Sequence, residues 1–163
     1  MTGPLLLVVP LAGAGSAVPR LAGSMPPPHV VLVDPFTLAP EEGTLAELGA
    51  FFADVVPFPV HLVGVSQFPS GSAYLTPDPA APFRRLAHEL SRVFADLPPH
   101  PTSFEDVPHI PVTLREGEDV AALQHDVEPC LPATTMAREA VLWRRTGDAV
   151  ETVATFAFAT SAA

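Results

Sequence analysis

The chain has no lysine and a single cysteine, and both shortages limit what the protein can do. Its eight basic residues, all arginines, stand against 18 acidic residues, for a formal net charge of −10. Sequence-independent binding to nucleic acid depends mostly on cationic side chains that neutralise phosphates, so this balance argues against a long RNA or DNA partner. A small-molecule ligand in a locally basic or neutral groove stays open.

The single cysteine, Cys130, excludes an internal disulfide and a cysteine-based zinc site, and a reducing cytoplasm is the expected location. No run of about 18 uninterrupted apolar residues occurs, so we expect no membrane-spanning segment and no membrane partner. Residues 1–15 combine an apolar run with small residues, but the first basic residue, Arg20, follows that run instead of preceding it. This order favours a buried first strand over a secretory signal.

Length and composition indicate a compact, loop-rich protein. At 163 residues the chain is about one domain long, and 48% of its residues are hydrophobic. The 21 prolines enforce many turns and strand boundaries. The patterns predict strands at residues 5–9, 29–35, 60–65, 73–75, 109–113, 136–143 and 150–160, and helices at residues 44–52, 83–93 and 116–127. This order favours an α+β protein with mostly antiparallel sheets. The length fits a single domain over residues 1–163, which two small lobes with a shared core would also satisfy.

Two of the expected helices carry signals at their starts. Thr44 and Glu47 fit a capping box, in which each side chain satisfies an otherwise unpaired backbone N–H. The acidic residues Glu116, Glu118 and Asp119 suit the positive end of a helix dipole. We expect the acidic group to be a solvated helix start and not a metal cluster.

Two similar stretches organise the whole chain. In residues 26–36 and again in residues 107–114, prolines lead into a run of β-favouring residues that begins with a histidine, His29 or His109. The two histidines lie about half the chain length apart. Two similar lobes that each contribute one imidazole to a shared groove would produce this spacing.

Strand alternation identifies the neighbours that share a face with each histidine. Val31 lies on the face of His29, and Pro111 and Thr113 lie on the face of His109. The alternative is that both are ordinary strand histidines, satisfied by the backbone, in a fold that catalyses nothing. No His-x-x-x-His pair or His/Asp cluster occurs at ligand spacing, so the sequence predicts no metal and no other cofactor.

Four stretches together resemble the bacterial 2′-5′ RNA ligase-like branch of the two-histidine phosphoesterase superfamily. They are residues 28–36, 57–58, 74–79 and 107–110. The resemblance extends from about residue 5 to residue 158. It implies a bilobal α+β fold with pseudo-twofold symmetry, in which two mostly antiparallel sheets flank a central groove and the helices lie outside. It also implies two His-x-Thr/Ser-x motifs that face each other and act on cyclic phosphodiesters without a metal.

The chain keeps both histidines of that motif and loses both hydroxyls. One imidazole takes a proton and the other gives one, and histidine suits either role near neutral pH. The Thr or Ser two residues on would hold the charge on the phosphoryl oxygens, but Val31 and Pro111 occupy these positions. Removing one such donor costs a factor of about 10² to 10³ in rate. Thr113 would compensate only if a bulge at Pro111 shortened its distance from His109.

Two further residues are candidates for the pocket. Tyr74 would offer a stacking platform for a ring, although an aromatic residue in a hairpin strand is often part of the core. Arg115, just past the second motif, would bind an anionic ligand or remain solvated. We assign Trp143 to packing and the pair Arg144 and Arg145 to the solvated surface.

Three functions follow. In the first, His29 and His109 perform acid–base catalysis on a small molecule that is not a phosphodiester, such as a specialised-metabolite cyclisation, isomerisation, dehydration or hydrolysis. In the second, the protein is a metal-independent 2′,3′-cyclic nucleotide phosphodiesterase or RNA-end-processing enzyme. In the third, it is a non-catalytic small-ligand-binding protein of the same fold. The sequence does not choose the substrate or the oligomeric state.

Overall fold

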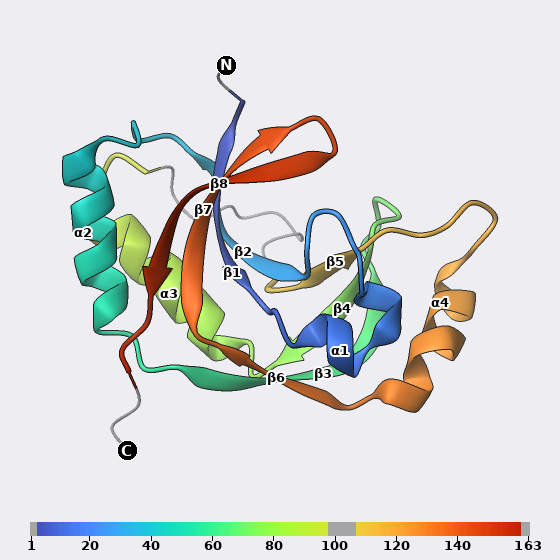
Figure 1. Ribbon diagram of the computed structural model, residues 1–163. Coiled ribbons are helices and arrows are strands. Elements are labelled where there is room, and N and C mark those ends of the chain that lie inside the picture. Colours follow the sequence, from blue (N-terminus) through green and yellow to red (C-terminus); the bar gives the residue numbers. More distant parts are fainter. Residues whose placement is uncertain (1–2, 98–106, 161–163) are drawn as a thin grey trace.

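Two antiparallel sheets of four strands each form the frame of the computed structural model, which describes residues 3–97 and 107–160 (Figure 1). The first sheet has the order β2 (His29–Phe36), β1 (Leu5–Pro10), β7 (Glu139–Thr146) and β8 (Ala149–Ala157). The second has the order β5 (Ile110–Val112), β4 (Ala73–Asp78), β3 (Phe58–Gln67) and β6 (Ala133–Ala137). All neighbouring strands are antiparallel, which confirms the predicted α+β class.

Helices pack against both sheets. Helices α2 (Glu42–Ala53) and α3 (Ala81–Val93) contact β8 and β2 of the first sheet. Helices α1 (Ala14–Ala17) and α4 (Val120–Val127) contact β6 and β3 of the second sheet. Helix α1 joins β1 to β2 of the first sheet but packs on the second sheet. Helix α3 joins β4 to β5 of the second sheet but packs on the first. Within the described ranges, no helix is long and apolar enough to cross a membrane.

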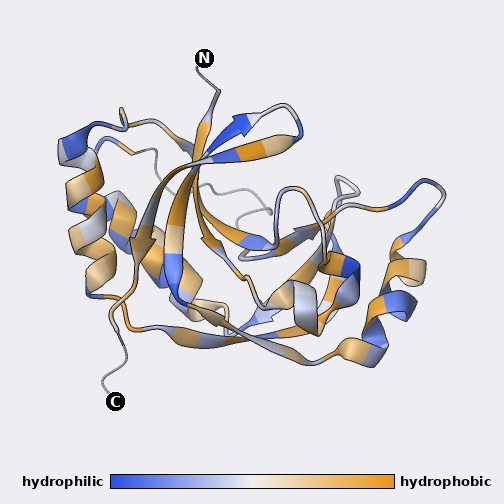
Figure 2. Ribbon diagram, in the orientation of Figure 1, coloured by the Kyte–Doolittle hydropathy of each residue, from blue (hydrophilic) through white to orange (hydrophobic). Residues whose placement is uncertain are grey.

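A continuous core fills the space between sheets and helices. It draws fully buried side chains from both sheets, such as Leu7 and Leu75, and from the helices, such as Phe52 and Leu90. Figure 2 shows hydrophobic residues along the strands of both sheets and on the helices. Burial of this apolar surface is the main stabilising term of the fold.

A second, smaller apolar cluster lies on the opposite face of the first sheet. It consists of Leu6, Val8, Val141 and Trp143, with Val31 packed against them. Strand alternation explains the division, since β1 sends alternate side chains to the two clusters. We call the face of each sheet that is turned away from the main core its site face.

The first strand and the C-terminal hairpin are confirmed, with one correction to the strand before the hairpin. Residues 5–10 form the buried strand β1, between β2 and β7. Gly147, with a φ of +68°, forms the turn between β7 and β8. The prediction of one strand at residues 136–143 is wrong, because two strands share this range. Met136 lies in β6 of the second sheet, and Trp143 lies in β7 of the first. The chain crosses between the sheets at Arg138.

The capping signals have mixed outcomes. The capping box is wrong, because α2 begins at Glu42 with Glu41 as its N-cap, and Thr44 lies inside the helix. An acidic residue in the first turn suits the positive end of the helix dipole, so the helix can begin before Thr44. Asp119 does cap α4, since its carboxylate accepts a hydrogen bond from the N–H of Ala122. The sequence also predicts an extended proline-rich loop at residues 97–108, which lies mostly outside the described residues.

Candidate two-histidine site

His29 is the first residue of β2, and its ring is held in one orientation. Its Nδ1 lies 2.7 Å from the carbonyl oxygen of Pro27, and only 6% of the residue is exposed. The ring packs edge-on against Trp143, with centroids 4.9 Å apart and an interplanar angle of 70°. A carbonyl only accepts hydrogen bonds, so Nδ1 carries the proton and the lone pair of neutral His29 is on Nε2.

His109 repeats this arrangement in the second sheet. It directly precedes β5, and its Nδ1 lies 2.7 Å from the carbonyl oxygen of Val107. Its ring packs edge-on against Phe68 and Tyr74, at centroid distances of 4.9 and 5.5 Å. Phe68 and Tyr74 stack on each other at 4.3 Å. In the neutral form of each histidine, the lone pair is therefore on Nε2.

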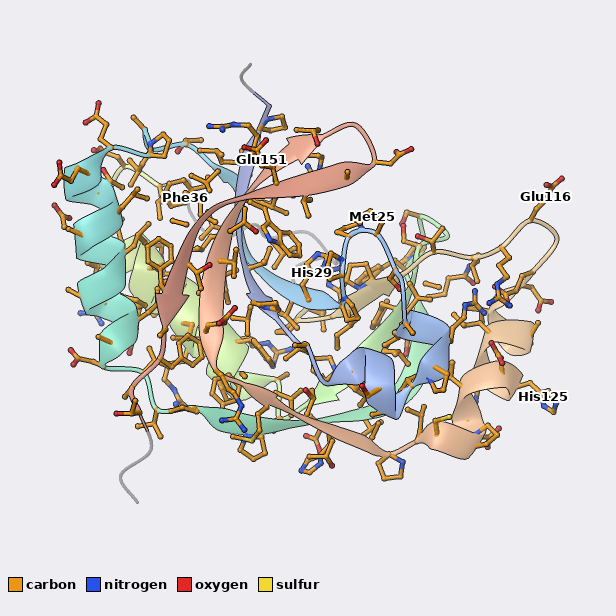
Figure 3. All side chains as sticks on the ribbon, viewed as in Figure 1. Met25, His29, Phe36, Glu116, His125 and Glu151 are labelled. Carbon is orange, nitrogen blue, oxygen red and sulfur yellow. The ribbon has the colours of Figure 1, made fainter. Side chains whose placement is uncertain are left out.

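The structure brings the two histidines into one region. Strands β2 and β5, at the edges of their sheets, contact each other (Figure 1). Figure 3 shows His29 in the middle of the molecule, whereas Glu116 and His125 lie at the periphery around α4. A positive charge on His109 would lower the pKa of His29, so the two side chains lie within electrostatic range of each other.

The surroundings of His29 favour its neutral form. Burial is the main reason why the pKa of His29 is lower than its ordinary value, and the charges of His109 and Arg145 lower it further. The hydrogen bond to Pro27 and the charge of Asp34 oppose this shift without reversing it. A neutral imidazole with its lone pair on Nε2 is able to accept a proton, which is what a general base requires.

Neither motif position beyond the histidines offers a hydroxyl. Val31 pairs with Val8 and packs in the small apolar cluster. Pro111 pairs with Tyr74 and has neither a hydroxyl nor a backbone N–H to donate. An anion at either position would lack the donor that a Thr or Ser supplies.

The bulge that would bring Thr113 to the site is absent. The pairing of β5 with β4 runs through Ile110, Pro111 and Val112 without a shift of register. Thr113 follows the end of β5, is exposed, and uses its carbonyl oxygen to accept a hydrogen bond from Arg20. No bulge therefore shortens the distance between Thr113 and His109, and Thr113 does not replace the missing hydroxyl.

Of the other two pocket candidates, Tyr74 lies beside His109 and Arg115 pairs with Glu118 instead. Tyr74 lies beside His109 on the site face of the second sheet, because its neighbours Ala73 and Leu75 face the core. Arg115 is exposed, and its backbone N–H donates to the carboxylate of Glu118, 3.0 Å away. Its charge acts on that carboxylate and contributes to its low pKa.

A part-buried group of ion pairs lies just beyond the end of β5, and no local sequence pattern indicates it. Arg20 donates to both carboxylate oxygens of Glu118, at 2.8 and 2.5 Å, and to Asp126 at 3.2 Å. The side chain of Arg20 is 6% exposed and that of Glu118 13%. The expectation of a fully solvated acidic group is therefore wrong for Glu118, whose hydrogen bond from Arg20 lowers its pKa to about 2.

Sequence reasoning also missed residues of the site face of the first sheet. Trp143 packs against His29, and Arg145 forms an ion pair with Asp34 at 3.4 Å. Strand alternation would have placed Trp143 and Arg145 on one face, but only the structure shows which face. Among the described residues, no group of three or more His, Cys, Asp or Glu side chains is arranged to hold a metal ion.

Comparison with known proteins identifies the family. Residues 20–149 match the 2′-5′ RNA ligase superfamily, and the chain belongs to it. This match and the fold confirm the two-histidine phosphoesterase assignment predicted from the sequence. A search of curated proteins gave no match.

Solved structures show the same fold over nearly the whole chain. Escherichia coli LigT complexed with 3′-AMP is 17% identical, with a TM-score of 0.64 over 98% of this chain and 100% of that chain. LigT complexed with ATP is 17% identical, with a TM-score of 0.60 over the same shares. A structure described as a phosphoesterase is 14% identical, with a TM-score of 0.59, also over 98% and 100%. At such low identity these similarities establish the fold alone.

Proposed function

We propose that this protein is an acid–base enzyme that uses His29 and His109 on a small molecule other than a phosphodiester. The proposal rests on one observation, that both imidazoles have the same hydrogen-bond arrangement. Each has Nδ1 at 2.7 Å from a backbone carbonyl oxygen and Nε2 left for chemistry. Val31 and Pro111 stand where a phosphate would need hydroxyl donors.

The two histidines take different roles in this proposal. His29, whose pKa is lowered mainly by burial, is neutral near pH 7 and accepts a proton through Nε2. His109, beside Phe68 and Tyr74, donates the proton to the departing or rearranging group. A cyclisation, isomerisation, dehydration or hydrolysis fits this pair equally.

Two features support a small, partly apolar substrate. Structures of Escherichia coli LigT contain 3′-AMP, ATP or NADP+, so the same fold accommodates small ligands. In this chain Val31, Trp143 and Tyr74 place apolar and aromatic surface around the histidines. Water is less able to compete for Nε2 beside such surface, which strengthens a hydrogen bond to the substrate.

A base-catalysed elimination tests the proposal without knowledge of the natural substrate. In 5-nitrobenzisoxazole, a base removes the proton on C3 while the N–O bond breaks, and a coloured cyanonitrophenolate forms. We expect the purified protein to accelerate this reaction, and His29→Gln to lower the rate roughly 10²-fold, since general bases contribute about that much. His88→Gln, which alters an exposed histidine on α3, is the matched control and should leave the rate unchanged.

Two outcomes would overturn the proposal. Equal elimination rates for the native protein and His29→Gln would mean that His29 is not an available base, and a non-catalytic binding protein would then fit better. Turnover of nucleoside 2′,3′-cyclic phosphates that disappears in both His29→Gln and His109→Gln would instead establish a cyclic phosphodiesterase.

A further inference from the structure

The site face of the first sheet extends beyond the histidine and ends in a positive charge. Along β7, Val141, Trp143 and Arg145 alternate with residues that face the other way. Val141 and Trp143 belong to the small apolar cluster, and Trp143 contacts His29. Arg145 is the next residue on this face, so its guanidinium lies next to the small apolar cluster.

Arg145 has a weak partner that a ligand can displace. Its Nη2 contacts one carboxylate oxygen of Asp34 on β2 at 3.4 Å, which is longer than a strong charge-assisted hydrogen bond. The two side chains are 43% and 36% exposed. Exposed ion pairs of this kind contribute little to stability, so an incoming anion loses little by replacing Asp34.

The placement of Asp34 depends on an irregularity in β2. The pairs Leu7–Val33 and Val8–Val31 differ by one residue in register, so β2 carries an extra residue between Val31 and Asp34. Asp34 therefore reaches the same face as Val31 and meets Arg145. Both charges act on His29, with Arg145 lowering and Asp34 raising its pKa, which shows that the pair belongs to the surroundings of that histidine.

Arg20 and Arg145 differ in how far their guanidinium groups are already occupied by carboxylates. Arg20 is 6% exposed in its side chain and is fully engaged by Glu118 and Asp126. Arg145 has the opposite character, with an exposed guanidinium and one long contact. In a chain with a formal charge of −10, an accessible guanidinium beside the small apolar cluster is the part of the site suited to an anion.

We propose that Arg145 binds an oxyanion group, a carboxylate or a phosphate, of a ligand whose apolar body packs on Val31 and Val150, the partly exposed side chains that cover the buried Trp143. This assignment rests on the proposed function for what happens at His29, and it adds the substrate class: a small apolar or aromatic acid. Asp34 occupies the guanidinium when no ligand is present and competes with the ligand anion.

Trp143 provides the readout, because it is the only tryptophan of the chain. The experiment titrates the native protein with benzoate, phenyl phosphate, inorganic phosphate and the neutral isostere benzamide, and follows Trp143 emission at neutral pH. We expect saturable changes with benzoate or phenyl phosphate and none with benzamide. Whichever of the two acids binds more tightly identifies the anion as a carboxylate or a phosphate.

Three variants test the residue assignment. Arg145→Gln should weaken binding of the acid roughly tenfold or more, as expected when one charged partner of a hydrogen-bonded anion is removed. Asp34→Asn should tighten binding, because it removes the competing carboxylate. Arg92→Gln removes one positive charge from the exposed end of α3 and should leave the dissociation constant unchanged.

The proposal is overturned if benzamide binds as tightly as benzoate, if Arg145→Gln binds the acids as the native protein does, or if none of the acids binds. Asp34→Asn keeps the test decisive should Arg145→Gln fold poorly, since an unchanged dissociation constant in Asp34→Asn also contradicts the proposal. Binding is measured here without turnover. Loss of elimination activity in His29→Gln with binding retained would therefore support both proposals, and binding without any histidine-dependent activity would reject only the enzyme.

Discussion

The imidazole of His29 lies edge-on against the indole of Trp143, with ring centroids 4.9 Å apart. This contact joins the first residue of β2 to β7 across the face of the first sheet. It also places the only tryptophan of the chain beside the proposed base. The optical properties of Trp143 should therefore report directly on the ionisation of His29.

A pH titration of Trp143 emission should show a transition with a midpoint below about 6.5, the ordinary value for histidine. Protonation places a positive charge beside the indole ring and changes its emission. Burial disfavours that charge, as do His109 and Arg145, while Asp34 favours it. In His29→Gln the transition should disappear, and a transition that remains in this variant would contradict the assignment.

Restoring the motif hydroxyls should create phosphodiesterase activity. The double variant Val31→Thr with Pro111→Thr returns a hydroxyl to each position on the strand face of its histidine. Because each such donor contributes a factor of about 10² to 10³, we expect at least 10² more turnover of a nucleoside 2′,3′-cyclic phosphate than in the native chain. The measurement is the release of nucleotide product by the purified proteins.

The matched control adds His29→Gln to the double variant and should return turnover to the native level. An unchanged rate in a folded double variant would show that the missing hydroxyls are not what separates this chain from phosphate chemistry. High turnover by the native chain would do the same.

Arg20→Gln should lower the melting temperature by roughly 2 to 4 °C, because it removes the part-buried partner that Glu118 and Asp126 share. Arg92→Gln, at an exposed site, should change it by less than about 1 °C. Thermal unfolding followed by circular dichroism measures both. Equal melting temperatures for Arg20→Gln and the native protein would mean that the ion-pair group is not stabilising.

The pH dependence of this stabilisation follows from Glu118. Its pKa lies at about 2 in the folded protein, below the ordinary 4.5, so the folded state binds a proton less readily than the unfolded state. The contribution is fully present above pH 4.5 and is lost as the pH falls toward 2. The difference in melting temperature between the native protein and Arg20→Gln should therefore become smaller as the pH falls from 4.5 toward 2. A constant difference would contradict the role of Glu118.

The family could be predicted from the resemblance of four short stretches to it, and the α+β class from the order of strand and helix patterns. The repeated prolines and β-favouring residues correctly placed His29 and His109 at the starts of two strand segments. The strand β1 was also predictable, since its continuous apolar run is typical of a strand buried on both faces. The capping box at Thr44 failed because two acidic residues allow α2 to begin earlier. Local patterns place such boundaries only within a few residues.

Long-range contacts could not be predicted from the sequence. Arg20 and Glu118 lie far apart in the chain, and no local pattern indicates that the two meet. Trp143 was assigned to packing, which its place in the small apolar cluster confirms, but its contact with His29 depends on the side-chain directions of three strands. The ion pair between Asp34 and Arg145 depends on an extra residue in β2, which sequence alternation does not reveal.

The central claim is that His29 and His109 form one site, and the most direct test is an NMR titration of the histidine ring protons in the native protein and in His109→Gln. We expect His29 to titrate below its ordinary range in the native protein, and its pKa to rise in His109→Gln because a neighbouring positive charge is gone. A pKa of His29 that is the same in both proteins would show that the two imidazoles do not interact, and would contradict the two-histidine site.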